Sequence, residues 1–199
     1  MFYLPKFKKI STAQELDVFA ATYTLCSGFD VPRGYYENNQ VFAIHWKSRM
    51  VGGFVLGAGS ILRTLEVFVG DESREGMYQR VNTSVPHTEM CCFWIDPSTR
   101  KKTWLNFLVW FCVAFALRVY GNQQLIFGTN SVRLAALYAA SPKCELIHQD
   151  FRNQKQTFVF TGPRRHCLLG VAQILLYKLK RVIHILGKRS VQSKPIKVF

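Results

Sequence analysis

The first residues of the chain that form a clear pattern carry apolar side chains at helical spacing. Leu16, Phe19, Ala20 and Tyr23 recur at intervals of one, three and four residues, which places them on one side of a helix. The preceding segment Ser11–Glu15 resembles a capping box, in which Ser or Thr caps the helix and Gln or Glu follows three residues later. The pattern therefore predicts a helix that begins near residue 12.

The next segments have the composition and length of strands. The runs Val41–Trp46 and Met50–Leu56 are rich in β-formers and are separated by the polar Lys47–Arg49, which predicts a hairpin. Leu65–Val69 (LEVFV) is interpreted as another short strand. His87–Ile95 (HTEMCCFWI) becomes wholly apolar toward its end, as expected for a buried central strand.

The most apolar segment of the chain is Trp104–Leu117 (WLNFLVWFCVAFAL), which only Asn106 interrupts. It is shorter than the ~18–20 residues of a spanning helix and has basic residues on both sides. We expect a helix that is buried against a sheet and ends near Tyr120–Asn122, where Gly and Asn favour a stop.

The remaining segments alternate between strand and helix. Gln124–Phe127 is strand-like, Ser131–Ala140 is helical and stops before a proline, and Glu145–His148 and Thr157–Phe160 are two further strands. The predicted order is helix, β-meander, then β-α-β-α-β. This order predicts an α+β fold with a mixed central β-sheet flanked by helices.

The C-terminal segment has a different character, because it is rich in Lys and Arg and contains no Asp or Glu after residue 163. Within Cys167–Gly187 the apolar residues and the polar residues lie on opposite sides of a helix, which predicts a basic amphipathic helix. We therefore divide the chain into a domain at residues 1–162 and a helix and tail at residues 163–199. Residues 164–188 could contact an anionic membrane, dock a carrier protein or pack on the domain.

Composition favours a folded, strongly basic protein. Of 199 residues, 49% are hydrophobic and 19% are charged, which argues against long disordered regions. The net charge of +14 predicts an anionic partner, whether nucleic acid, a lipid surface, a phosphorylated cofactor or an acidic protein. Nucleic acid is the least expected of these, because the basic residues gather in an amphipathic helix with few aromatic residues between them.

The cysteines predict reduced, mostly buried thiols. No CxxC spacing occurs, and the adjacent Cys91 and Cys92 would point to opposite faces of a strand, so no metal site is predicted. The N-terminal segment has no apolar stretch long enough for a secretory signal, and a cytoplasmic protein, peripheral at a membrane if the C-terminal helix binds one, is the expectation.

The junction CCFWIDPSTRKKTWLNFL (Cys91–Leu108) carries the strongest chemical signal. It predicts a strand, a proline turn and a basic first helical turn. A helix N-terminus offers free N–H groups and a partial positive charge to a phosphate, and basic residues at that end oppose the helix dipole unless they bind an anion. The alternative is an ordinary helix start with a solvated basic turn.

This junction and its surroundings resemble the GNAT superfamily, the GCN5-related N-acetyltransferases. Ile95–Pro97 matches the family's turn and Arg100 its first signature residue, while Thr103 and Leu105 stand where the family has glycines. The hairpin resembles the family's second and third strands, and SVRLAALY, which ends at Tyr138, resembles its second conserved helix. The resemblance implies a GNAT-like sheet, and it is closest to long-chain N-acyl amino acid synthases.

The resemblance implies an N-acyltransferase that uses a phosphopantetheine thioester. The donor would be acyl-coenzyme A or acyl-phosphopantetheine on an acyl carrier protein, bound as a co-substrate and not as a tightly held cofactor. The carrier protein suits the missing glycines and the positive charge. The amine acceptor would be an amino acid or a Lys or ornithine side chain of a peptide, and the group transferred a long-chain fatty acyl group. The donor-binding residues implied are Phe93, Ile95, Arg100, Lys101, Lys102, Thr103, Trp104, Leu105 and Asn130.

The catalytic residues implied by the family lie on the predicted fourth strand and the second conserved helix. Glu89 would remove the amine proton, with His87, which has the same parity on the strand, as the alternative. Tyr138 would protonate the leaving thiolate. Glu66 is a weaker candidate for holding the acceptor amine, and each of these residues has an ordinary structural explanation as well.

Two rival hypotheses remain open. Cys91 or Cys92 could act as a nucleophile if a histidine such as His87 or His148 lay nearby, although direct transfer without a covalent intermediate is preferred. Alternatively, the chain could be a non-catalytic module of the same fold that binds an anionic membrane or an acidic partner.

Overall fold

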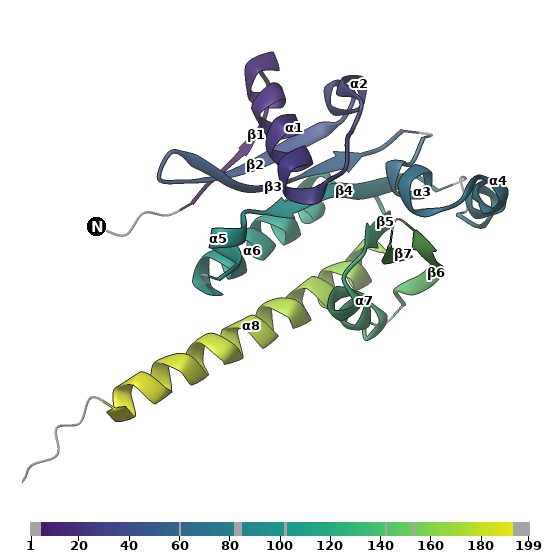
Figure 1. The fold of residues 1–199 in the computed structure, drawn as a ribbon. Coiled ribbons are helices and arrows are strands. Elements are labelled where there is room, and N and C mark those ends of the chain that lie inside the picture. Colours follow the sequence, from purple (N-terminus) through teal and green to yellow (C-terminus); the bar gives the residue numbers. More distant parts are fainter. Residues whose placement is uncertain are drawn as a thin grey trace, which may run out of the picture.

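A seven-stranded mixed sheet forms the centre of the protein in a computed structural model, which describes residues 5–59, 61–81, 85–101, 103–141, 143–152 and 154–192 (Figure 1). The strand order is β1-β2-β3-β4-β5-β7-β6. Neighbouring strands pair antiparallel except β4 and β5, which pair parallel. The strands are β1 (Lys6–Lys9), β2 (Gln40–Trp46), β3 (Arg49–Gly57), β4 (His87–Ile95), β5 (Gln124–Thr129), β6 (Glu145–Arg152) and β7 (Lys155–Pro163).

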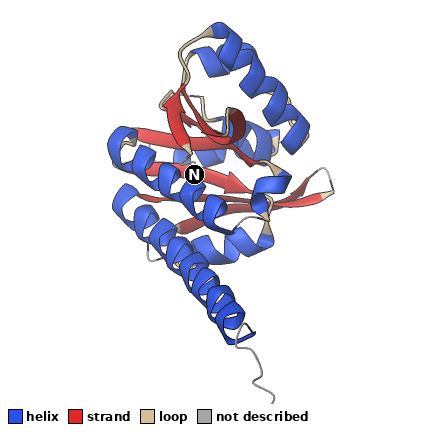
Figure 2. Ribbon diagram, turned by 90° about the vertical axis from the view of Figure 1, so that its left-hand side faces the viewer, coloured by secondary structure: helices blue, strands red, loops and turns tan. Residues whose placement is uncertain are grey.

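Helices cover both faces of this sheet (Figures 1 and 2). One face packs against α1 (Ala13–Ser27), α2 (Arg33–Glu37), α3 (Arg63–Phe68) and α4 (Asp71–Arg80). The other face packs against α6 (Thr103–Tyr120), α7 (Val132–Ala139) and the first turns of α8 (Arg164–Gln192), and the short α5 (Pro97–Arg100) precedes α6. The predicted α+β class with a mixed, helix-flanked sheet is confirmed.

The first helix and the first hairpin form as the sequence predicts. Thr12 caps α1, and its hydroxyl accepts the N–H of Glu15 at 3.3 Å, while Gly28 ends the helix with a left-handed φ of 77°. Lys47 and Ser48 join β2 to β3 with φ values of 50° and 62°. Two consecutive left-handed residues suit the right-handed twist of the strands that they connect.

The prediction of a strand at Leu65–Val69 is wrong, because residues 63–68 form helix α3. Leu65 and Val69 are fully buried one helical turn apart, in a cluster with Ile126 of β5 and Val159 of β7. Strand β1 was not predicted, because its sequence KFKK offers a single apolar residue at the sheet edge.

Helix α6 is buried on one side only, so the prediction of a helix buried against the sheet holds for half of its circumference. Leu105, Val109, Val113 and Ala116 are fully buried, whereas the opposite side of the helix is open to solvent. Among the described residues, no helix is long and apolar enough to cross a bilayer.

Helix α8 begins and ends beyond the limits predicted for the C-terminal helix. Its first turns are part of the core through Cys167 and Val171, and its later turns project away from the sheet (Figure 1). Arg164 at its start donates to the carbonyl of Gly121 just after α6, which holds the two helices together at that end.

Candidate active site

The sheet opens between β4 and β5, and a cavity of about 680 Å³ occupies the opening. The parallel pairing of these strands runs only from His87↔Gln124 to Met90↔Phe127. Beyond it, residues 90–95 of β4 and residues 128–131 at the end of β5 both line the cavity. Because helices from both faces of the sheet also line it, a ligand could reach the opening from either face.

A β-bulge lies at the centre of this opening. Cys92 has a φ of 50°, and the register between β3 and β4 shifts between Gly53 and Val55. The bulge breaks the alternation of side chains along β4. The prediction that Cys91 and Cys92 point to opposite faces is therefore wrong: their sulfurs lie 3.6 Å apart, and both residues line the cavity.

The part of the cavity on the α6–α8 face combines two arginines with amide and apolar side chains. Arg100 lines it, with its Nε donating to the carbonyl of Ile95 at 2.8 Å. Arg133 at the start of α7 donates to the hydroxyl of Tyr177 on α8 at 2.6 Å. The other described lining residues on this side include Phe93, Asn106, Trp110, Asn130, Ser131, Leu134 and Leu137.

The free N–H groups of the proline turn are bound by Asp96, an aspartate of the same turn. Asp96 caps α5, and its Oδ1 accepts the N–H groups of Ser98 and Thr99 at 2.9 and 3.3 Å. Burial raises the pKa of Asp96, but hydrogen bonds from Ser98 and the charge of Arg49 outweigh burial and leave it below its usual value. The carboxylate of Asp96 thus occupies the first turn of α5, where a phosphate would otherwise bind, and Arg100 is a cation of this turn that lines the cavity.

The donor residues predicted from the resemblance fall into three groups. Phe93, Ile95, Arg100 and Asn130 line the cavity. Three others do not line it: Lys101 is exposed, Trp104 packs edge-to-face on Trp46 with ring centroids 5.8 Å apart, and Leu105 is fully buried. Lys102 and the side chain of Thr103 lie outside the described residues.

Tyr138 lies where the resemblance predicts it, in the wall of the cavity. Its ring is wedged edge-to-face against Phe127 and Phe160, with centroid distances of 4.9 and 5.6 Å. Burial raises the pKa of Tyr138 well above its usual range, and the nearby Cys144 and Cys167 raise it further. The phenol is therefore protonated at neutral pH, and its hydroxyl can donate a hydrogen bond to an anion that forms beside it.

Glu89 does not line the cavity, contrary to what direct proton transfer would need. It is fully buried, and its carboxylate accepts the backbone N–H groups of Arg63, at 2.9 Å, and Thr64. It also accepts the hydroxyl of Tyr35 at 2.6 Å. Glu89 thus caps the N-terminus of α3, a structural role that the side-chain pattern of β4 did not indicate.

Tyr35 connects this buried carboxylate to the cavity. Its hydroxyl lies 2.9 Å from the Cys91 sulfur, and Cys91 lines the cavity. Burial, followed by the proximity of Cys91 and Glu89, raises the pKa of Tyr35 far above its usual range. Burial likewise raises the pKa of the Cys91 thiol, so this cysteine is a poor nucleophile at neutral pH.

His87 and Glu66 also lie away from the described cavity lining. His87 is at the start of β4, where its carbonyl accepts the side-chain amide of Asn122 at 2.9 Å. Glu66 is on helix α3 and not on a strand. It pairs with Arg74 at 3.0 Å and accepts the hydroxyl of Tyr78 at 3.1 Å.

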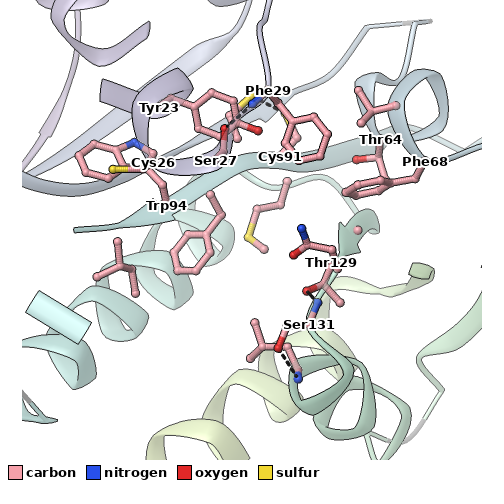
Figure 3. A pocket seen from close by; sticks show the side chains of 18 of the residues that line it. Tyr23, Cys26, Ser27, Phe29, Thr64, Phe68, Cys91, Trp94, Thr129 and Ser131 are labelled. Carbon is pink, nitrogen blue, oxygen red and sulfur yellow. Dashed lines mark hydrogen bonds between the residues drawn. The ribbon is translucent and has the colours of Figure 1, made fainter. Parts of the chain in front are cut away.

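The cavity wall on the α1–α4 face contains residues that are not among the predicted site residues (Figure 3). Phe29 and Phe68 meet edge-to-face with centroids 6.4 Å apart, and Lys155 stands over the Phe29 ring at 5.8 Å. Arg63 donates from Nη2 to the carbonyl of Asp30 at 2.6 Å, while its Nε is buried without a hydrogen-bond partner among the described residues.

The described lining residues include four cations and no carboxylate. Arg63 and Lys155 belong to the wall near Phe29, and Arg100 and Arg133 to the wall near α6–α8. A close glycine shapes the first wall, because a Cβ on Gly128 would lie 2.2 Å from the Phe68 ring. The cavity therefore favours ligands with negative charge at both ends.

Comparison with known proteins identifies the fold. No family model matches the sequence, and no curated protein matches it. Among solved structures, FeeM, an N-acyl amino acid synthase from uncultured soil microbes, is similar at 10% identity, with 82% of this chain and 93% of that chain covered and a TM-score of 0.55.

Two further solved structures are similar to this chain over most of its length. The loading GNATL domain of CurA from Lyngbya majuscula has 11% identity, 82% and 99% coverage and a TM-score of 0.51. A putative acetyltransferase of the GNAT family from Desulfovibrio desulfuricans has 10% identity, 81% and 99% coverage and a TM-score of 0.51. The chain has the GNAT fold, which confirms the predicted resemblance.

Proposed function

We propose that the protein is an N-acyltransferase that moves an acyl group from a phosphopantetheine thioester to an amine. The observation that carries the proposal is the cavity between β4 and β5, which is lined from both faces of the sheet. A thioester arm entering from one face and an amine entering from the other would meet at the bulge. Such an arrangement brings the reacting atoms together without a covalent enzyme intermediate.

The wall on the α6–α8 face suits the donor. Arg100 and Arg133 supply charge for the phosphate of the arm, and Asn106 and Asn130 supply amides for its peptide-like groups. Apolar side chains such as Trp110 give a fatty chain a surface to pack on. We propose an acyl carrier protein as the natural donor, because the protein's charge of +14 suits an acidic carrier.

The wall on the α1–α4 face suits an acceptor that carries a carboxylate. Arg63 has a buried Nε without a hydrogen-bond partner in the part of the chain that the structure describes, and Lys155 stands over the Phe29 ring. A free amino acid fits this wall better than a polyamine, whose additional positive charge would meet these two cations. FeeM, whose fold this chain shares, is by name an N-acyl amino acid synthase.

The proposed reaction needs little acid–base machinery. The neutral amine attacks the thioester carbonyl, a carbon–nitrogen bond forms, the carbon–sulfur bond breaks, and Tyr138 passes a proton to the thiolate as it takes one from water, so that no tyrosinate forms. The surplus proton on the amine leaves to water. Because Arg63 and Lys155 disfavour an ammonium ion beside them, they lower the pKa of a bound amine and increase its neutral fraction.

The test is a thioester assay with matched acceptors. Acyl-coenzyme A and acyl carrier protein of several chain lengths are offered with an aromatic amino acid or with the amine that lacks only its carboxylate. We expect free thiol and an N-acyl amino acid by mass spectrometry, with kcat/KM about 10²-fold lower for the decarboxylated amine. No thioester consumption with any donor or amine would overturn the proposal and favour a non-catalytic module that binds an anionic partner.

A further inference from the structure

The outer face of α6 is an exposed apolar stripe. Trp104, Phe111, Phe115 and Val119 are each between 41% and 54% exposed, although the first three belong to the most apolar segment of the chain. At 100° per residue Trp104, Phe111 and Phe115 share one sector of α6, apart from its fully buried residues, and Val119 lies at the edge of that sector. A stripe of large apolar side chains at the surface marks a site of contact with another body.

Helix α8 carries a second stripe of the same kind. Leu169, Leu176, Leu179 and Ile183 are between 42% and 60% exposed and share one side of the helix. The core-facing Cys167 and Val171 lie on the opposite side. The α8 stripe therefore points away from the sheet, whereas the α6 stripe runs past the edge of the sheet, where Phe115 packs edge-to-face on Phe7 of β1 with ring centroids 6.2 Å apart.

The two helices run antiparallel beside each other. Arg164 at the start of α8 contacts Gly121 after the end of α6, and Trp110 of α6 and Tyr177 of α8 both reach the cavity. Helices aligned in this way can place both stripes against one flat surface. We call the two stripes together the α6–α8 surface.

Charge and aromatic content identify what this surface contacts. Lys101 and Arg118 flank the α6 stripe, and Arg165 and Lys180 are exposed on the same side of α8 as its stripe. Trp104 packs edge-to-face on Trp46, and Lys47 stands over the Trp46 ring at 4.9 Å. Tryptophan and lysine around an apolar face are typical of proteins that lie in the headgroup region of a bilayer.

A second copy of this chain fits less well. The α8 stripe has the three- and four-residue spacing of a coiled-coil seam, but residues 164–192 contain no Asp or Glu to pair with their Lys and Arg. Two such helices would bring like charges together. We propose that the α6–α8 surface docks on an anionic lipid membrane, with α6 and α8 lying along it.

The test is sedimentation of the full chain with vesicles of phosphatidylcholine, with and without about one third phosphatidylglycerol. Phe111→Gln with Phe115→Gln, and separately Leu176→Gln with Leu179→Gln, should each weaken partitioning into the anionic vesicles about tenfold or more. The matched control is Leu25→Gln with Phe151→Gln. These residues are 87% and 71% exposed on α1 and β6, and their replacement should leave partitioning unchanged.

A second measurement starts from the unmodified protein and its own tryptophans. Trp94 and Trp110 are buried, so lipid brominated on its acyl chains should quench Trp46 and Trp104, and Trp104→Phe should remove most of this quenching. Three results would overturn the proposal: equal partitioning of the test and control variants, absence of quenching, or a protein dimer that the Phe111 and Phe115 changes dissociate. Binding of the same surface to an acidic carrier protein but not to vesicles would overturn it too.

Discussion

Tyr138 is the residue whose replacement tests the chemistry most directly. The residue belongs to the cavity lining, and burial raises the pKa of its hydroxyl and keeps it protonated. We expect Tyr138→Phe to lower kcat about 10²-fold with the KM for the thioester donor changed less than about twofold. Steady-state kinetics with a single donor and acceptor measure both constants. An unchanged kcat in a variant that melts at the wild-type temperature would show that another group protonates the thiolate.

Cys144 is the residue whose reactivity should differ most from that of the other thiols. Its sulfur lies 3.5 Å from that of Cys167, and a hydrogen bond from Cys167 lowers the pKa of Cys144 to about 6. Burial raises the pKa of Cys112 to about 11. The rate at which iodoacetamide alkylates Cys144 should therefore rise with pH through a midpoint near 6. At neutral pH Cys144 should be modified before Cys112.

A variant isolates the cause of this reactivity. Cys167→Ala removes the S–H donor, and it should move the midpoint for Cys144 up toward the usual thiol value of about 8.5. Peptide mapping by mass spectrometry assigns each modified cysteine. A midpoint that does not move in this variant would exclude Cys167 as the source of the lowered pKa.

At the scale of single elements, helix α3 depends on a residue far away in the sequence. The buried carboxylate of Glu89 accepts hydrogen bonds from the first N–H groups of α3 and from the Tyr35 hydroxyl. In Glu89→Gln the amide nitrogen would face donors, so we expect the free energy of unfolding to fall by about 2–4 kcal/mol. Urea denaturation measures this change, and Glu66→Gln, at a half-buried position of the same helix where the carboxylate pairs with Arg74, is the control with an expected loss below about 1 kcal/mol. An equal loss in both variants would contradict the capping role.

The same helix shows where local sequence patterns stop being informative. Strand β4 is predicted from His87 to Ile95, and α1 begins where its capping residues indicate, because each signal lies within the element itself. LEVFV lacks a capping residue of its own and is rich in β-branched residues, so it favours a strand by composition. Its helical form depends on Glu89 and on burial against β5 and β7, which only the assembled fold provides.

The residues that line the cavity also divide into those that the sequence predicts and those that only the assembled fold shows. Phe93, Ile95, Arg100 and Asn130 were predictable because they adjoin a recognisable strand–helix junction. The opposite wall is built from α1, α3 and β7, elements distant in sequence, and none of its residues belongs to a motif. The bulge at Cys92 was equally hidden, since it depends on the pairing of β4 with β3.

At the scale of the whole molecule, the excess of 26 Lys and Arg over 12 Asp and Glu should act through long-range attraction. If an acidic carrier protein is the donor, its KM should rise about fivefold between low and high salt. The KM of the corresponding acyl-pantetheine, which lacks the carrier, should change by less than about twofold. Parallel changes in the two KM values would exclude a carrier-docking surface.

The short parallel seam between β4 and β5 has a consequence for how the molecule moves. It divides the sheet into two antiparallel halves, β1–β4 and β5–β7, each held by its own longer ladders. Four residue pairs at one end of the opening form a natural hinge, about which the halves can tilt. A ligand that contacts both halves would restrict this tilt, so the sheet would become more rigid as more of the cavity is occupied.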